Sequence, residues 1–157
     1  MGDSSSATFF RSRSVDQMEY KVGAILAQQP PPQPLSAVVF HYNHGTGVRH
    51  GIADKVGAAF LNRRQHVILG LHGGTTPGHV EAQDFADAAT WVTQLEEAID
   101  QNGLCLQGGG FPSFFPPDQV DVERFFGTRG AARLRCLKAR LDPDGLFCQA
   151  LPSLRAA

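Results

Sequence analysis

The chain has 157 residues, 42% of them hydrophobic, and a formal net charge of -1 from 14 basic and 15 acidic residues. This length and composition predict one ordinary domain that buries a core without metal ions or cross-links. The balanced charge offers no electrostatic footprint for nucleic acid or for an anionic membrane, so neither partner is expected.

Cysteine usage and hydropathy indicate the compartment. The 3 cysteines, Cys105, Cys136 and Cys148, are odd in number and show no C-x-x-C spacing. This pattern favours reduced, packed thiols in a cytosol-like compartment over a disulfide framework. No apolar run approaches the ~20 residues that cross a bilayer, and the N-terminus lacks the basic-then-apolar order of a signal peptide. We therefore expect a cytoplasmic protein.

The first third of the chain predicts a strand and a helix. Residues 1–6 are Ser-rich and expected to be disordered, and residues 7–12, "ATFFRS", have the aromatic content of a short strand. A helix is expected over residues 14–28, because Ser14 and Gln17 match a capping box. Its apolar face would consist of Met18, Val22 and Ile25. The prolines of "PPPQP" would then end this helix.

Two longer strands show a clear alternation of side chains, and a Gly-rich loop is expected between them. In residues 35–43, "LSAVVFHYN", one face carries Val38, Phe40 and Tyr42, and the other carries Val39, His41 and Asn43. In residues 66–74, "HVILGLHGG", one face carries Val67, Leu69 and Leu71, and the other carries His66, Ile68, Gly70 and His72. Each strand therefore has an apolar face and a face on which histidine is mixed with small or apolar residues.

The second half of the chain predicts two helices separated by an irregular segment. Residues 75–103 give the strongest helix signal, with Gly103 as its stop. The stripe that would face the core is Phe85, Ala88, Val92, Leu95 and Ile99. Trp91 lies off this stripe and is interpreted as a packing residue. "GGGFPSFFPPD" is too rich in Gly and Pro for regular structure, and we expect it to lie over another part of the molecule.

The last helix is expected over residues 131–141, with Leu134, Leu137 and Leu141 on one side, followed by a turn at "DPDG". Short "LCLQ" at residues 104–107 is a candidate strand. These elements predict an α+β fold, in which a mostly antiparallel sheet has helices packed on one face. The other face would be open towards a cofactor domain or a partner.

Two stretches carry a family resemblance. In "RFFGTRGAARLRCLKARLDPDGLF" the matching residues are Phe126-Gly127, Arg133-Leu134, Lys138, Asp142-Pro143 and Phe147. In "LSAVVFHYNHGTGVRHGIADKVGAAFLNRRQHVILGL" the "AF-x-x-R" element is formed by Ala59, Phe60 and Arg63. Together these stretches resemble the C-terminal, substrate-binding half of berberine bridge enzyme-like FAD-linked oxidases. The resemblance covers residues 7–150 and leaves residues 151–157 as a tail.

The resemblance implies a flavin that this chain does not bind alone. No segment resembles the Gly-rich phosphate-binding stretch or the His and Cys attachment sites of the family's flavin domain, so FAD would come with a partner domain. Residues expected on the cofactor side are Phe111, Ser113, Phe126 and Gly127. Two departures weaken these contacts, because "TRGAA" replaces the family's Asn-Tyr and Ser113 stands where the family has an asparagine.

The chemistry implied by the resemblance needs a base on the sheet face that meets the flavin. Strand alternation offers His66, Gly70 and His72 for that position. His72 is the preferred base, because an imidazole titrates near neutral pH, and His41 is its possible catalytic partner. Residues expected to bind the substrate are Asn43, His44, Arg49, His66 and Gly70. The alternative is that His72 and His41 are simply polar residues of a half-exposed face.

A metal site is not expected. His41 and His44 would have to converge with His50, His72 or His79, and no Cys or carboxylate lies at ligand spacing nearby. The arginines Arg49, Arg63 and Arg64 have two interpretations: they meet an anionic group of the substrate or flavin, or they are solvated.

Three functional hypotheses follow. The leading one is the substrate-binding half of a flavin-linked oxidoreductase that acts on a small molecule and needs a flavin-domain partner or self-association to cover its free face. The second is a cofactor-independent binding or cyclase-like protein that keeps the substrate pocket. The third is an inactive remnant.

Overall fold

Three alternating segments form an antiparallel sheet in the computed structural model, which describes residues 8–16, 20–44, 65–76, 81–106, 110–147 and 154. The strands are β1 (Thr8–Val15), β2 (Ala37–Asn43) and β3 (His66–Gly74), in the order β1-β3-β2. The helices of the described residues are α1 (Tyr20–Gln28), α4 (Ala82–Gln101) and α5 (Val122–Leu141). The α+β fold class predicted from the sequence is therefore confirmed.

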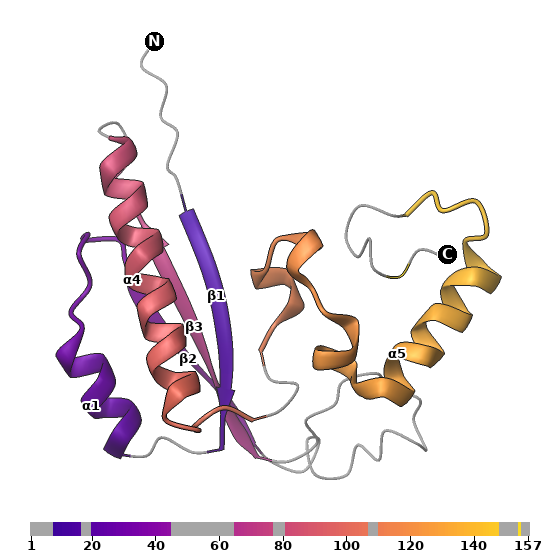
Figure 1. The fold of residues 1–157 in the computed structure, drawn as a ribbon, viewed down its shortest axis with the longest axis horizontal. Helices are drawn as coiled ribbons and strands as arrows, with labels where there is room; N and C mark the ends of the chain where they lie inside the picture. The colour runs from indigo at the N-terminus through magenta and orange to yellow at the C-terminus, as the bar shows by residue number, and fades with distance from the viewer. Residues whose placement is uncertain are drawn as a thin grey trace.

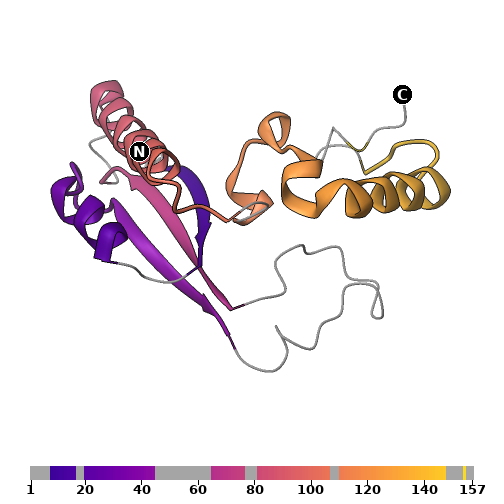
Figure 2. The same cartoon turned by 60° about the horizontal axis from the view of Figure 1, so that its bottom comes forward.

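The helices α1 and α4 cover one face of the sheet, as Figures 1 and 2 show. The core between these layers contains the apolar faces expected of β3, α1 and α4. Its buried members are Val15, Val22, Ile25, Val67, Leu69, Leu71, Trp91, Val92, Leu95 and Ile99. Trp91 is a packing residue, as expected, and its Nε1 donates to the carbonyl oxygen of Gln29 at 2.9 Å. This bond ties the end of α1 to α4.

Arg13 attaches β1 to α4 from within the same face. Its side chain is almost completely buried and forms a bidentate pair with Asp100, with both N···O distances at 2.9 Å. Glu96 completes the ion-pair network by contacting Arg13 and, at 3.6 Å, Arg11. Because a buried guanidinium needs its donors satisfied, this network fixes the position of α4 along β1.

Cys105 is a member of the same network and not a reactive thiol. Its Sγ donates to Oδ1 of Asp100 at 2.8 Å. Burial, together with the hydrogen bond to this carboxylate, raises the pKa of Cys105 to about 12. The thiol therefore stays protonated, in agreement with the packing role expected from the sequence. Cys136 is free and exposed, whereas Cys148 lies outside the described residues.

The predicted capping box at Ser14 is wrong, since β1 continues through Val15 and α1 begins only at Tyr20. Ser14 pairs with Ile68 in the sheet, and its carbonyl oxygen accepts a hydrogen bond from the amide of Leu106 at 2.7 Å. These long-range pairings outweigh the local helix signal. The expected strand at 104–107 is reduced to a single bridge between Cys105 and Val15.

The last helix is longer than predicted. It begins after Asp121, whose side chain accepts hydrogen bonds from the amides of Glu123 and Arg124 at 2.9 and 3.2 Å. Its course is broken at Gly127, where φ is 69°. Sequence periodicity missed the first turns because their Val122 and Phe125, both buried, precede this break. In Figures 1 and 2, α5 lies on the opposite side of the sheet from α1.

The residues that follow α5 are held by hydrogen bonds to Asp142 and Lys138. Asp142 pairs with Lys138 and accepts hydrogen bonds from the amides of Leu146 and Phe147 at 2.8 and 3.0 Å. Lys138 Nζ also donates to the carbonyl oxygen of Phe147 at 2.7 Å. The predicted "DPDG" turn is confirmed, with Gly145 at a φ of 67°. The helices of the described residues include none long and apolar enough to cross a membrane.

Replacing Arg13 by alanine should lower the free energy of unfolding by about 3 kcal/mol, the lower end for breaking a buried pair, because the Asp100 side chain is 42% exposed. The matched control is Arg135→Ala, which removes a pair to Glu123 whose side chains are 45% and 49% exposed. This control should cost less than about 1 kcal/mol. Urea denaturation followed by circular dichroism measures both values, and equal losses would contradict the structural role of Arg13.

Candidate functional site

The face of the sheet turned away from α1 and α4, called the second face below, carries the histidines singled out by the sequence. One row across the strands is Phe10, His72 and Ala37, and the next is Ser12, Gly70 and Val39. A third row is Ser14, Ile68 and His41. The middle row of this face therefore contains a serine, a glycine and a valine, with no large side chain.

The irregular segment at residues 110–114 lies over this row. The amide of Gly110 donates to Ser14 Oγ at 2.9 Å, and the amide of Phe111 donates to Ser12 Oγ at 2.7 Å. Gly110 has a φ of 110°, and a Cβ added to it would lie 2.7 Å from Ser12 Oγ. Only glycine fits there, so two serine hydroxyls and one glycine hold the segment against β1. This agrees with the expectation that the segment lies over another part of the molecule.

Five rings follow one another across the second face, and we call them the ring cluster: Phe10, His41, His72, Phe111 and Phe114. His72 is stacked on Phe10 with a centroid distance of 4.4 Å and an interplanar angle of 3°. Phe114 lies 5.6 Å from Phe10 and 5.4 Å from Phe111, which meets His41 edge-on at 5.2 Å. A Cβ at Gly70 would lie 3.3 Å from Phe114 Cε2, so glycine there lets the ring approach the strand.

His72 has a polar atom without a partner. Its Nε2 is buried and has no hydrogen bond within the part of the chain that the structure describes. Burial also lowers the pKa of His72 below its ordinary value. The imidazole is therefore neutral at neutral pH, and it can accept a proton or a hydrogen bond from a bound molecule.

His41 and His72 share the second face but are not neighbours. His41 lies opposite Ile68, whereas the position opposite Ala37 is His72, four residues further along β3. Four residues of strand span about 13 Å. Gly70 and the rings of Phe111 and Phe114 lie between the two imidazoles, so no proton passes directly from one to the other in this arrangement.

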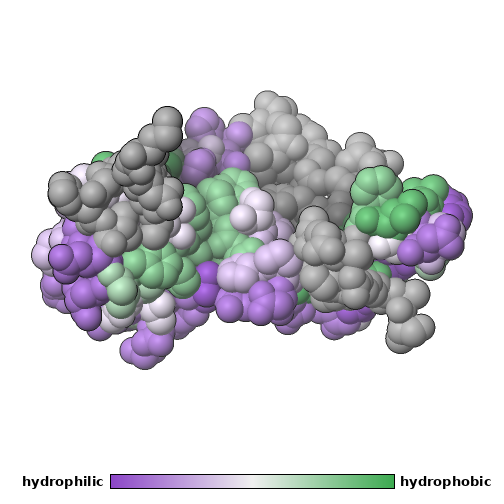
Figure 3. All heavy atoms as spheres, turned by 90° about the horizontal axis from the view of Figure 1, so that it is seen from above, coloured by the Kyte–Doolittle hydropathy of each residue, from purple (hydrophilic) through white to green (hydrophobic). Residues whose placement is uncertain are grey.

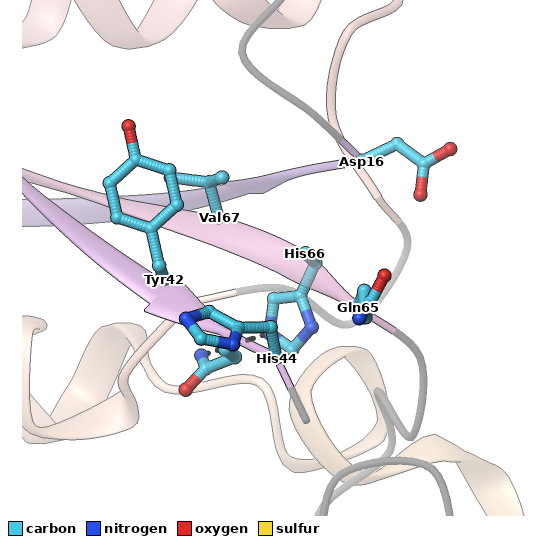
Figure 4. Close-up of a pocket in the computed structure, with 7 residues that line it drawn as sticks. Asp16, Tyr42, His44, Gln65, His66 and Val67 are labelled. Carbon is cyan, nitrogen blue, oxygen red and sulfur yellow. Dashed lines mark hydrogen bonds between the residues drawn. The ribbon is translucent and has the colours of Figure 1, made fainter. Parts of the chain in front are cut away.

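A pocket of about 210 Å³ lies at the other end of the strands. Asn43 and His66 face each other across β2 and β3, with Nδ2 of Asn43 3.2 Å from Nε2 of His66. The pocket is lined by Asp16, Tyr42, Asn43, His44, Gln65, His66 and Val67, which are drawn as sticks in Figure 4. This lining contains hydrogen-bonding groups and the phenol ring of Tyr42, which suits a small polar molecule with an apolar part.

The structure divides the residues expected from the sequence into two groups. His72, His41, Gly70 and Phe111 lie in or beneath the ring cluster, and Asn43, His44 and His66 lie in the pocket.

The other expected cofactor residues lie elsewhere: Ser113 is exposed in the short turn Pro112–Phe114, and Phe126 and Gly127 belong to α5. Arg49 lies outside the described residues, as do His50, Arg63, Arg64 and His79. The "AF-x-x-R" element is also outside them.

Sequence reasoning missed the β1 side of the site. Phe10, Ser12 and Ser14 alternate along β1 as a strand face requires, and this period of two could have revealed their shared direction. The pairing of the two serines with Gly110 and Phe111 has no local signal. Among the residues that the structure describes, no three His, Cys, Asp or Glu side chains are grouped as metal ligands.

His72 should make the protein less stable in mild acid. A lowered pKa in the folded state means that the unfolded chain binds the proton more tightly. The contribution of His72 is therefore complete above its ordinary pKa of 6.5 and is lost as the pH falls below it. His72→Gln should remove this part of the pH dependence of the free energy of unfolding. Equal slopes for the two proteins between neutral and mildly acidic pH would rule out a buried, neutral His72.

Gly110→Ala should detach the segment 110–114 from β1. The added methyl group would lie 2.7 Å from Ser12 Oγ and 2.9 Å from its carbonyl oxygen. We expect a loss of about 2 kcal/mol or more in the free energy of unfolding. Gly103→Ala is the control, because Gly103 also has a positive φ, of 66°, but no atom lies within 4 Å of its Cβ position. A larger loss for Gly103→Ala would contradict the clamp at Gly110.

Comparisons with known proteins add no relative to this picture. None of the protein-family models matches the chain, and none of the curated proteins compared with it is significantly similar. The interpretation of the site therefore depends on the ring cluster, the pocket and the residues that carry the family resemblance.

Proposed function

We propose that the chain is the substrate-binding half of a flavin-linked oxidoreductase and that it acts with a separate flavin-binding domain. The observation that carries this proposal is the buried Nε2 of His72 on the sheet face opposite the helices, which has no hydrogen-bond partner among the described residues. Phe10, stacked on this imidazole, and the neighbouring Phe114 provide apolar surface beside it.

In this proposal His72 is the base. Nε2 of the neutral imidazole accepts a proton from a substrate hydroxyl, while the adjacent C–H bond breaks and its hydride leaves. FAD, bound by the partner domain, supplies the acceptor for these two electrons. The ring of Phe10, stacked on the imidazole, shields it from water, which keeps it uncharged before the reaction. His41 takes no part in this step, because Phe111 and Phe114 separate it from His72.

A second candidate function is supported by the pocket at Asn43 and His66. That pocket is lined by residues of this chain. His66 and His72 are six residues apart on β3, about 20 Å along the strand, so a small ligand in the pocket is out of reach of His72. This arrangement supports a cofactor-independent protein that binds a small molecule at Asn43, His44 and His66.

Flavin binding is the first test of the leading proposal. The purified chain should be colourless, and added FAD should keep its full fluorescence, because the proposed flavin site belongs to a partner. When a flavin domain of the berberine bridge enzyme-like group is added as a separate chain with FAD, a panel of small alcohols should bleach the flavin absorbance. A yellow, flavin-loaded monomer of this chain alone would contradict the proposal outright.

Two histidine variants separate the two candidate functions. His72→Gln should slow flavin bleaching by about 100-fold or more, the typical contribution of a general base, whereas His66→Gln should leave the rate unchanged. If the pocket is the functional site, His66→Gln should instead abolish the binding of a small-molecule ligand detected by calorimetry without flavin. Equal bleaching by wild type and His72→Gln would remove His72 from the chemistry.

A further inference from the structure

The strand β2 lies at one edge of the sheet formed by the described residues. In the order β1-β3-β2, this strand pairs with β3 on one side, and no strand of the described residues pairs with it on the other. Three of its large hydrophobic side chains are exposed, with Val39 at 46%, Phe40 at 39% and Tyr42 at 60%. Leu35, just before the strand, is 46% exposed. A row of free backbone donors and acceptors flanked by apolar side chains is a template for another strand.

The strand β2 has no charged residue, proline or bulge, which are the features that commonly prevent an edge strand from pairing with another chain. Its sequence, "AVVFHYN", contains no Lys, Arg, Asp or Glu and no proline. The pairing with β3 runs without a bulge from Ala37 to Asn43. A flat, uncharged strand of this kind accepts a partner strand without burying an unpaired charge.

The opposite edge of the sheet is protected. At the end of β1, the amide of Leu106 bonds the carbonyl oxygen of Ser14 at 2.7 Å, and Cys105 bridges to Val15. Two arginines, Arg11 and Arg13, lie within β1 and would oppose pairing of this strand with itself. The β2 edge of the sheet is therefore the edge that can accept another strand.

We propose that β2 pairs with β2 of a second copy of this chain, so that two three-stranded sheets join across a two-fold axis. The register that pairs all seven residues of the strand is centred on Phe40. Phe40 then faces Phe40 of the second copy, and Val38 faces Tyr42 of the second copy on both sides of the axis. Aromatic–aromatic and aromatic–β-branched pairs are among the most favourable cross-strand pairs.

A second copy fits this edge better than a different protein would. The strand carries no charge that a complementary partner could recognise, whereas its apolar and aromatic positions match themselves about Phe40. Because each copy has a single growing edge, the pairing closes as a dimer and does not continue into a fibre. This pairing uses the edge of β2 and does not cover the second face. The dimer proposal can therefore be tested independently of the proposed flavin partner.

Substitutions at Phe40 test the interface. Wild type should sediment at twice the monomer mass of 16.9 kDa in analytical ultracentrifugation. Phe40→Lys and Phe40→Glu, each alone, place like charges opposite each other at the axis and should halve the mass to 16.9 kDa. An equimolar mixture of the two variants should recover the dimer, because lysine then faces glutamate. This recovery also shows that both variants are folded.

Leu141→Lys is the matched control for adding a charge to an exposed apolar side chain. Leu141, Leu146 and Phe147 form a second apolar patch at the end of α5, visible as a green area at the right of Figure 3, with exposures of 72%, 76% and 81%. If β2 is the interface, Leu141→Lys should keep the mass of the dimer. A wild-type monomer, a dimer dissociated by Leu141→Lys, or a mixture of charged variants that stays monomeric would each overturn the proposal.

Discussion

Successive side chains of β1 point to opposite faces of the sheet, and their contacts attach a different part of the chain to each face. Arg13 points to one side of the sheet and binds Asp100 of α4. Ser12 and Ser14 point to the other side and bind the amides of Phe111 and Gly110. Because the side-chain period of a strand is two, a shift of one residue in β1 would bury the serines against α4 and turn the arginines towards the ring cluster. The helix layer and the aromatic segment are thus fixed by one register.

The ring cluster and the ion-pair network divide the polar chemistry of the molecule between the two faces. On the helix side, carboxylates surround the buried guanidinium, and the hydrogen bonds from Arg13 and Cys105 outweigh burial to lower the pKa of Asp100. On the other side, His72 is stacked on the ring of Phe10, and burial is the cause that lowers its pKa. The first environment keeps Arg13 and Asp100 ionised and the Cys105 thiol protonated, all in structural roles. The second favours a neutral base, which is the property on which the proposed chemistry depends.

Much of the layer structure could be predicted from the sequence, because alternation in β3 and the stripe of α4 report directly which side chains face the core. Val67, Leu69 and Leu71 are buried against the helices as expected. Long-range pairing could not be predicted in the same way. The residue that pairs with Ser14 is Ile68, and no sequence pattern near Ser14 indicates this pairing. Likewise, the faces of His41 and His72 follow from alternation, but their separation follows only from the register of β2 against β3.

The contacts of β1 also set the order in which the molecule can fold. The bonds from Arg13 to Asp100, from Gly110 to Ser14 and from Phe111 to Ser12 close separations of 87, 96 and 99 residues. During synthesis these bonds of β1 can therefore form only after residues 100–111 have been made. Closing such long loops lowers the entropy of the chain before the stabilising contacts form. This topology is therefore expected to fold slowly and to leave its apolar strands exposed to chaperones during folding.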